Sequence, residues 1–213
     1  MRRYWGQQKP PLGVPANKGH ILCPSSGLWL MNEGHGSPIV QDLSGNGNTG
    51  TLTGTSPSWI AGDLGAAIDL PGTNEDIVLA NTINLTYPWT IILKYWPDTN
   101  SSVFFGDNTT TTSFFRHNAN ATILTLRNAA GTDRNITGFT DVTTQWNTLA
   151  IVTTATDRVA GYQNGKFINL NEITWDVGFN VNCIGHGYTG ASIQYNGKIG
   201  YCSIYNRAYQ QAK

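Results

Sequence analysis

The sequence is poor in charge and lacks any long apolar run. Only 12% of its 213 residues are charged, and 13 basic residues balance 13 acidic ones to a formal net charge of zero. Nucleic-acid binders usually carry a basic excess, so we expect no nucleic-acid partner. No stretch reaches the roughly 18 consecutive apolar residues of a membrane-spanning helix, so we expect no membrane partner. The first twenty residues hold no apolar run of secretory length, so no signal peptide is expected.

Cysteine is also scarce. The three cysteines, Cys23, Cys183 and Cys202, are far apart in the chain, which excludes a dense disulfide framework and a CxxC zinc site. Cys183 and Cys202 both fall in expected strands, so two readings stay open: the two thiols pair, or both are buried and free. Free thiols are typical of proteins that fold in a reducing cytoplasm.

The residues of common hydrolytic sites are missing as well. There are three glutamates, and the nearest approach to a catalytic carboxylate pair on one strand face is Glu172 with Asp176. There is no G-x-S-x-G motif, and the four histidines show neither metal-ligand spacing nor a paired nucleophile. We therefore expect a protein that is not an enzyme and that requires no cofactor.

What the sequence does contain points to many short strands. The 24 glycines favour turns, and threonines and aromatic residues favour strands. Short runs with alternating apolar and polar residues, such as residues 89–96 and 146–154, recur every 8–12 residues or so, as in sandwiches and barrels. Asn164-Gly165 lies between two such runs and predicts a two-residue hairpin turn. The expected fold class is all-β, with two antiparallel sheets packed as a sandwich.

The first 24 residues differ from the rest, so we divide the chain into an extended arm, 1–24, and a β domain, 25–213. The arm has four prolines and four basic residues without an acidic one. Proline excludes a regular helix or a central strand there. Two interpretations stay open: a disordered leader, or an anchor that orders on a partner. The residues expected to make the anchor are Arg2, Arg3, Tyr4, Trp5 and Lys9.

Five segments in order resemble the concanavalin A-like (LamG-like) jelly-roll family, and together they span residues 27–209. They are "GLWLMNEG", "DLSGNGNTGTLTG", "WIAGDLGAAIDLPGTNEDIVLA", "WNTLAIVTTATDRVAGYQNGKFI" and "GKIGYCSIYNRAY". The resemblance implies an antiparallel two-sheet jelly roll. The leader running into the first segment is similar to LamG-type proteins of tailed bacteriophages.

The resemblance implies a virion structural protein, such as a bacteriophage capsid decoration, assembled in the host cytoplasm. Its arm would hold the major capsid protein or neighbouring copies in a symmetric array. The alternative is a carbohydrate-binding adhesion module, virion-borne or extracellular, that recognises host-surface glycans.

Two kinds of binding residue are candidates. Relatives hold structural calcium with hard oxygen ligands, which suggests two candidate sites. The first is a loop with Asp42, Asn46 and Asn48, and the second is the segment with Asn74, Glu75 and Asp76. The other reading of Asp42 is a cap for the backbone of its own loop. Glycan binding needs aromatic platforms beside polar groups, and the candidates are Trp175 and Tyr188. Core packing is expected for the tryptophans at family-like strand positions: Trp29, Trp59, Trp89, Trp96 and Trp146.

Overall fold

A computed structural model describes residues 26–99, 102–110, 112–118, 122–140, 143–155, 158–172, 178–187 and 194–208. The arm, with Arg2, Arg3, Tyr4, Trp5 and Lys9, lies outside the described residues, as do Trp175 and Tyr188. Within the described ranges the chain forms strands and no helix. Accordingly, those ranges contain no helix long and apolar enough to cross a membrane.

Strand β7 (Trp89–Pro97) shows how the sequence pattern produces the sandwich. Successive side chains of a strand point to opposite faces of its sheet. Ile91, Leu93 and Tyr95 are buried, whereas Lys94 and Trp96 between and after them are partly exposed. The strand therefore has an inner face in the core and an outer face toward solvent.

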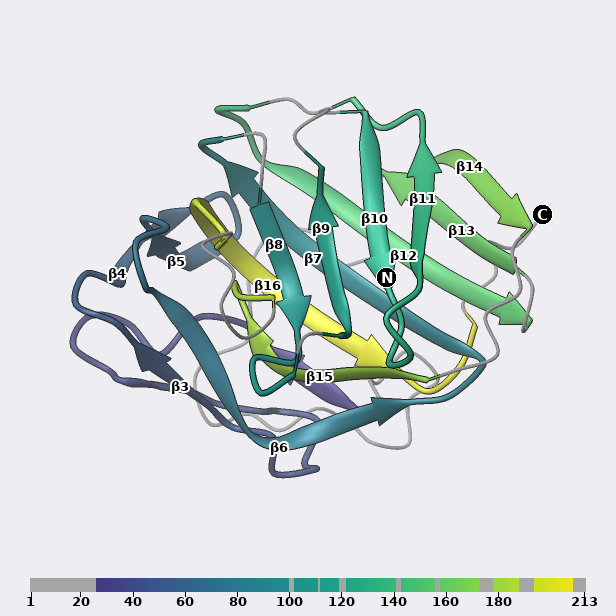
Figure 1. The fold of residues 1–213 in the computed structure, drawn as a ribbon. Helices are drawn as coiled ribbons and strands as arrows, with labels where there is room; N and C mark the ends of the chain where they lie inside the picture. Colours follow the sequence, from purple (N-terminus) through teal and green to yellow (C-terminus); the bar gives the residue numbers. More distant parts are fainter. Residues whose placement is uncertain are drawn as a thin grey trace, which may run out of the picture.

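The strands form two sheets in which every pairing is antiparallel, shown one in front of the other in Figure 1. The rear sheet, here the β7 sheet, has the order β14 (Lys166–Glu172), β13 (Arg158–Gln163), β12 (Asn147–Ala155), β7, β16 (Gly197–Tyr205), β5 (Gly65–Leu70) and β4 (Ser58–Gly62), with β1 (Gly27–Trp29) also paired to β16. The front sheet, here the β15 sheet, has the order β11 (Asp133–Thr137), β10 (Ile123–Arg127), β9 (Phe114–His117), β8 (Ser102–Gly106), β15 (Phe179–Ile184), β6 (Asp76–Leu85), β3 (Gly50–Thr53) and β2 (Ile39–Val40). This confirms the predicted all-β, two-sheet jelly-roll sandwich.

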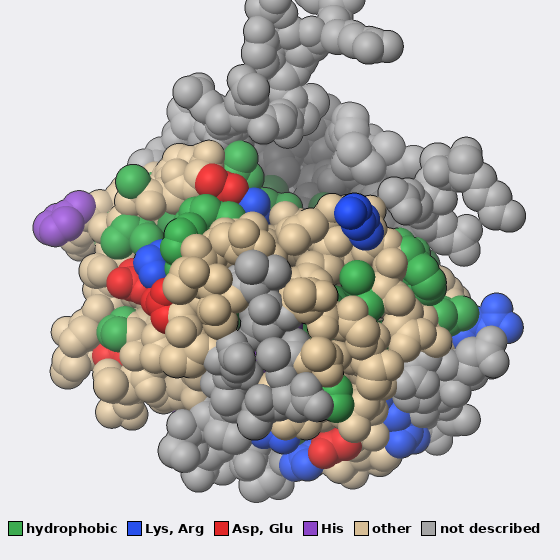
Figure 2. Space-filling model, turned by 90° about the horizontal axis from the view of Figure 1, so that it is seen from above, with side chains coloured by type: hydrophobic (Ala, Val, Ile, Leu, Met, Phe, Trp, Pro, Cys, Tyr) green, Lys and Arg blue, Asp and Glu red, His purple; other side chains and the backbone are tan. Residues whose placement is uncertain are grey.

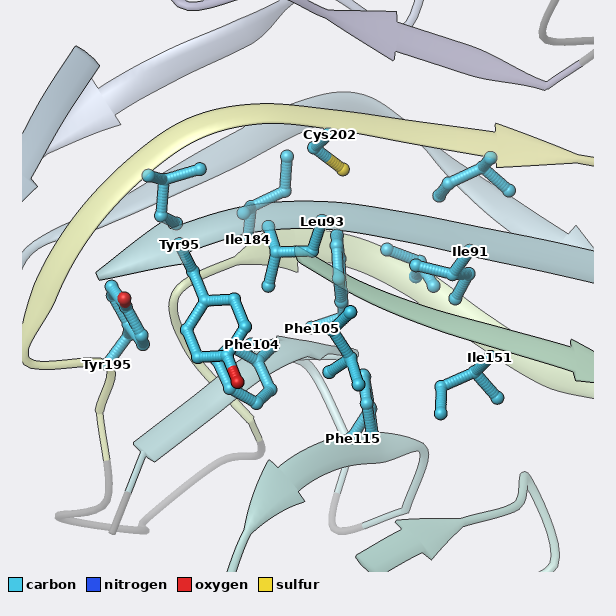
Figure 3. Close-up of a cluster of buried hydrophobic side chains, with 14 of the residues drawn as sticks. Ile91, Leu93, Tyr95, Phe104, Phe105, Phe115, Ile151, Ile184, Tyr195 and Cys202 are labelled. Atoms are coloured by element: carbon cyan, nitrogen blue, oxygen red, sulfur yellow. The ribbon is translucent and has the colours of Figure 1, made fainter. Parts of the chain in front are cut away.

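The core lies between the inner faces of the two sheets. Figure 3 shows Leu93 and Tyr95 of the β7 sheet pointing toward Phe104 and Phe115 of the β15 sheet. The rings of Tyr95 and Phe104 meet edge to face, with centroids 4.9 Å apart, a favoured aromatic geometry. Burial of such large apolar side chains is the main source of stability for a sandwich of this size.

Two local expectations have clear outcomes. Asn164 and Gly165 join β13 to β14 with φ of 51° and 76°, so the predicted hairpin turn is confirmed. Cys183 and Cys202 are both buried and free, so the alternative in which they pair is wrong. The reason is that Cys183 belongs to β15 and Cys202 to β16, which lie in different sheets.

Candidate functional site

Two tryptophans meet on the outer face of the β7 sheet. Trp96 lies on β7 next to the buried Tyr95, so the alternation of the strand directs it outward. Trp146 comes directly before β12, and its ring meets that of Trp96 edge to face at 5.9 Å between centroids. Both side chains are partly exposed. Large aromatic side chains that stay partly exposed on a sheet face are a common feature of ligand-binding surfaces.

Two glycines make room for the indole of Trp146. A Cβ atom built on Gly200 would lie 3.2 Å from the Trp146 ring, and one built on Gly62 would also lie 3.2 Å from it. Gly200 sits where the register between β16 and β7 shifts, and Gly62 ends β4. The ring therefore packs closely on the sheet at positions where larger residues would have to displace it.

Charged side chains surround this pair. Lys198 Nζ lies 2.9 Å from Asp98 Oδ2 and 5.3 Å from the centre of the Trp96 ring. Trp96 Nε1 donates a hydrogen bond of 3.1 Å to Asp98 Oδ1. On the other side, Lys94 Nζ lies 2.7 Å from Asp63 Oδ2 and 6.0 Å from the centre of the Trp146 ring.

Two further groups complete what we call the outer tryptophan cluster: Trp96, Trp146, Lys94, Lys198, Asp63, Asp98, Asp69 and Tyr201. Burial raises the pKa of Tyr201 to about 12, and the negative charges of nearby groups, including Asp63, act in the same direction. Burial also raises the pKa of Asp69, an effect that the ammonium of Lys198 partly offsets. The tyrosine hydroxyl is therefore a neutral donor at physiological pH.

The outer tryptophan cluster combines aromatic surface with hydroxyl, ammonium and carboxylate groups. Figure 2 shows one face of the molecule, seen from above, on which hydrophobic, basic and acidic side chains lie near one another. Sugars present apolar C–H faces, which stack on aromatic rings, and hydroxyl groups, which pair with charged and polar side chains. The chemistry of the cluster thus suits a carbohydrate.

The loop expected to hold calcium uses its carboxylate differently. Asp42 Oδ1 accepts hydrogen bonds from the backbone N–H groups of Leu28 (3.1 Å) and Ser44 (2.9 Å), and Oδ2 accepts one from Asn48 (2.9 Å). The side-chain amide of Asn48 donates to Ser26 O, and that of Asn46 donates to Ser44 Oγ. Both carboxylate oxygens therefore accept hydrogen bonds from N–H donors, which fits the loop-cap reading, and the calcium reading stays a prediction.

The second calcium candidate includes Asn74 and Asp76. Asn74 is exposed, and its backbone N–H donates to Glu75 Oε2 at 3.1 Å. Asp76 is buried, and its carboxylate accepts hydrogen bonds from Thr53, Cys183 and His186. A thiol and an imidazole are not ligands that calcium prefers. The Asp76 carboxylate is thus engaged by these three donors, and calcium binding at this second site stays a prediction.

The expectation for the tryptophans needs one correction. Trp29 and Trp89 are fully buried, and Trp59 packs against the core. Trp96 and Trp146, expected in the core, lie on the outer face instead. The sequence could have predicted the outer position of Trp96, because Trp96 follows Lys94 by two positions and residues two apart on a strand share a face.

Comparisons with known proteins support the fold. No protein-family model matches the chain, and no curated protein is similar to it. Domain 4 of an extracellular arabinanase from Geobacillus stearothermophilus, solved with arabinotriose, is similar with a TM-score of 0.62 at 21% identity, over 79% of this chain and 87% of that domain. The binding domain of Paraclostridial mosquitocidal protein 1 gives 0.61 at 17% identity, over 88% of this chain and 49% of that one.

A sialidase from Trypanosoma rangeli is also similar, with a TM-score of 0.58 at 11% identity, over 86% of this chain and 30% of the sialidase. This chain thus spans about half of the toxin domain and less than a third of the sialidase. At these identities the likeness concerns the fold alone. The chain is a jelly-roll β-sandwich of the kind found as a domain in these larger proteins.

Proposed function

We propose that this protein is a non-catalytic carbohydrate-binding module and that the outer tryptophan cluster is its binding surface. The observation that carries the proposal is the pair formed by Trp96 and Trp146 on a sheet face, bordered by the ion pairs of Lys94 and Lys198. Aromatic rings beside a few polar groups are the usual elements of a sugar site.

The side chains have complementary roles in this proposal. The indoles provide apolar area for a sugar ring. Contacts between two aromatic rings contribute about 0.5 to 1.5 kcal/mol beyond burial, and we expect a sugar on an indole to contribute on the same scale. Asp98 is 37% exposed and Asp63 is 34% exposed, so their carboxylates can accept hydrogen bonds from sugar hydroxyls. The lysine partners keep these carboxylates fixed in position. The arabinotriose bound by a domain of similar fold is consistent with this role.

The same carboxylates argue against catalysis. Glycosidases use one carboxyl group as a proton donor and a second, ionised one as nucleophile or base. Asp63 and Asp98 each form an ion pair with a lysine, so both carboxylates are already engaged. We infer binding without turnover.

The test is direct binding of glycans to the full chain. A glycan array that includes arabino-oligosaccharides gives the ligand, and calorimetry then measures its affinity for Trp96→Ala and Trp146→Ala. Each variant should weaken binding by about two- to tenfold or more, because one aromatic contact is lost. Phe167→Ala removes a 55% exposed aromatic side chain of β14 and is the matched control, which should bind normally.

Two outcomes would contradict the proposal. If both tryptophan variants bound the sugar with the affinity of the parent, the outer tryptophan cluster would not be the binding surface. Release of reducing ends during prolonged incubation with the bound oligosaccharide would show turnover. If turnover is lost in Asp69→Asn, the cluster is an active site and the non-catalytic part of the proposal is wrong.

A virion role is the second candidate, and the observation in its favour is the leader. Residues 1–24 combine four prolines with four basic residues and no acidic one, and they resemble the start of phage LamG-type proteins. In this candidate the arm attaches the domain to capsid subunits or neighbouring copies, and the sandwich faces outward. Deleting residues 1–24 should abolish incorporation into particles and leave glycan binding intact. Unchanged incorporation would refute the anchor.

A further inference from the structure

A second cluster of reactive side chains lies on the outer face of the β15 sheet. Cys183 Sγ lies 3.3 Å from Asp76 Oδ2, and His186 Nδ1 lies 3.1 Å from the same oxygen. The three ligand atoms all lie within 4.8 Å of one another. Cys183 is fully buried, Asp76 is 6% exposed, and the His186 side chain is 19% exposed. The cluster is therefore buried on two sides and reaches solvent at the histidine.

The fold builds this cluster from three segments. Asp76 begins β6, and Ile77 after it points into the core, so Asp76 points outward. Cys183 is opposite Val78 in the register of β15 with β6, which gives it the same face. His186 follows β15, and the next residue, Gly187, lies against β8.

Two glycines allow the backbone next to His186 to lie on the sheet. A Cβ atom built on Gly106 of β8 would lie 2.3 Å from the carbonyl oxygen of Gly187, a distance that real Cβ atoms do not show. A Cβ built on Gly187 would lie 3.0 Å from Val103. The backbone at Gly187 thus approaches the strand closely, and this approach holds the neighbouring His186 over Asp76.

We propose that Asp76, Cys183 and His186 bind a thiolate-preferring divalent cation, with Zn²⁺ as the expected ion. Bonds of about 2.0 to 2.3 Å in a tetrahedral site put neighbouring ligand atoms about 3.3 to 3.5 Å apart. The observed separations of 3.3 Å and 3.1 Å from Asp76 Oδ2 are close to that spacing, and the sulfur and the imidazole lie within 4.8 Å of each other. Water takes the fourth position, on the side where the histidine reaches solvent.

The ligand types select the metal. Thiolate and imidazole favour zinc and related transition ions over calcium and magnesium, which prefer oxygen. Thr53 fixes the orientation of the Asp76 carboxylate, because its hydroxyl donates a hydrogen bond to the other carboxylate oxygen, Oδ1. Such partners fix the orientation of a ligand and typically change metal affinity by about 10- to 100-fold.

Binding includes the loss of one proton. The Cys183 thiol releases its proton to water as the sulfur–metal bond forms, so the cation replaces H⁺ on sulfur. Metal binding should therefore weaken steadily as the pH falls.

Cobalt provides the test, because Co²⁺ substitutes for Zn²⁺ and has a visible spectrum. One equivalent of Co²⁺ added to the reduced full chain should give a thiolate-to-metal charge-transfer band and the strong visible bands of tetrahedral cobalt, and Zn²⁺ should displace it. Cys183→Ala should abolish the charge-transfer band. Cys202→Ala, which removes a buried thiol of the opposite sheet, is the matched control and should keep the band.

The remaining variants keep the proposal testable if Cys183→Ala does not fold. His186→Ala changes a partly exposed side chain and should weaken cobalt binding at least about tenfold, and Thr53→Val should weaken it by about 10- to 100-fold. The proposal would be overturned if Co²⁺ added to the parent protein showed only the spectrum of aqueous Co²⁺. So would a charge-transfer band that survives in Cys183→Ala. The outcome is independent of glycan binding, which lies on the other sheet.

Discussion

The Asp42→Ala substitution tests how the loop after β2 is held. It removes the acceptor of three backbone N–H groups, those of Leu28, Ser44 and Asn48, at 3.1, 2.9 and 2.9 Å. Leu28 belongs to β1, and the carbonyl of Asn48 accepts a hydrogen bond from the buried Trp29 indole. One carboxylate thus connects the loop, the strand β1 and a core side chain.

The expected loss of stability follows from the three donors. A buried N–H group left without an acceptor costs about 1 to 3 kcal/mol. This loop is only partly buried, so water can reach some of the donors and the lower end of that range applies to each. The total is about 3 kcal/mol. Asp42→Asn keeps one acceptor oxygen and should lose about half as much.

Urea unfolding followed by tryptophan fluorescence measures the loss. With a denaturant dependence of about 2 to 3 kcal/mol/M, the midpoint of Asp42→Ala should fall by about 1 to 1.5 M. Asp133→Ala, which breaks an exposed ion pair with Arg127, is the control and should cost less than about 1 kcal/mol. A loss as small as that of the control would refute the capping argument. A calcium-dependent rise in the parent midpoint that disappears in Asp42→Ala would instead support a calcium site.

Three further predictions concern the core and the titrating groups. Phe104→Ala should cost about 3 to 5 kcal/mol in urea unfolding, whereas the exposed Phe167→Ala should cost within about 0.5 kcal/mol. Tyr201 has a pKa of about 12 in the folded protein and about 10 in the unfolded protein, so the stability of the fold should fall as the pH rises from 10 to 12. Alkaline unfolding followed by circular dichroism should show a less steep fall for Tyr201→Phe. Burial alone would raise the pKa of Asp76, but hydrogen bonds from His186, Thr53 and Cys183 outweigh it and lower the pKa. Its contribution to stability should be present above about pH 4 and lost as the pH falls further, and Asp76→Asn should show a flatter acid limb in urea unfolding.

Local sequence signals predicted the fold class well. The Asn164-Gly165 turn follows from two adjacent residues that tolerate positive φ, so no distant contact is needed to place it. The alternation along β7 likewise separates the inner and outer faces. The insertion of β16 between β7 and β5 is different, because it depends on pairing between residues about a hundred positions apart. No local pattern specifies that order.

The candidate sites were less predictable for the same reason. Trp96 could be placed on the outer face from its spacing to Lys94, but Trp146 precedes its strand, and its position depends on room left by Gly62 and Gly200. The contact between Asp76 and Cys183 joins residues 107 positions apart. Each residue type has many ordinary roles, and only the register of β6 with β15 brings the two together.

The central position of β16 has a consequence for folding during synthesis on the ribosome. Of the described strands it comes last along the chain, yet it pairs with β7 on one side, β5 on the other, and β1 as well. Until residues 197–205 have emerged, β5 and β7 are open edges whose unpaired N–H and C=O groups can join other chains. A nascent chain that stalls before Gly197 therefore lacks the middle of a sheet, and it is a natural substrate for chaperones.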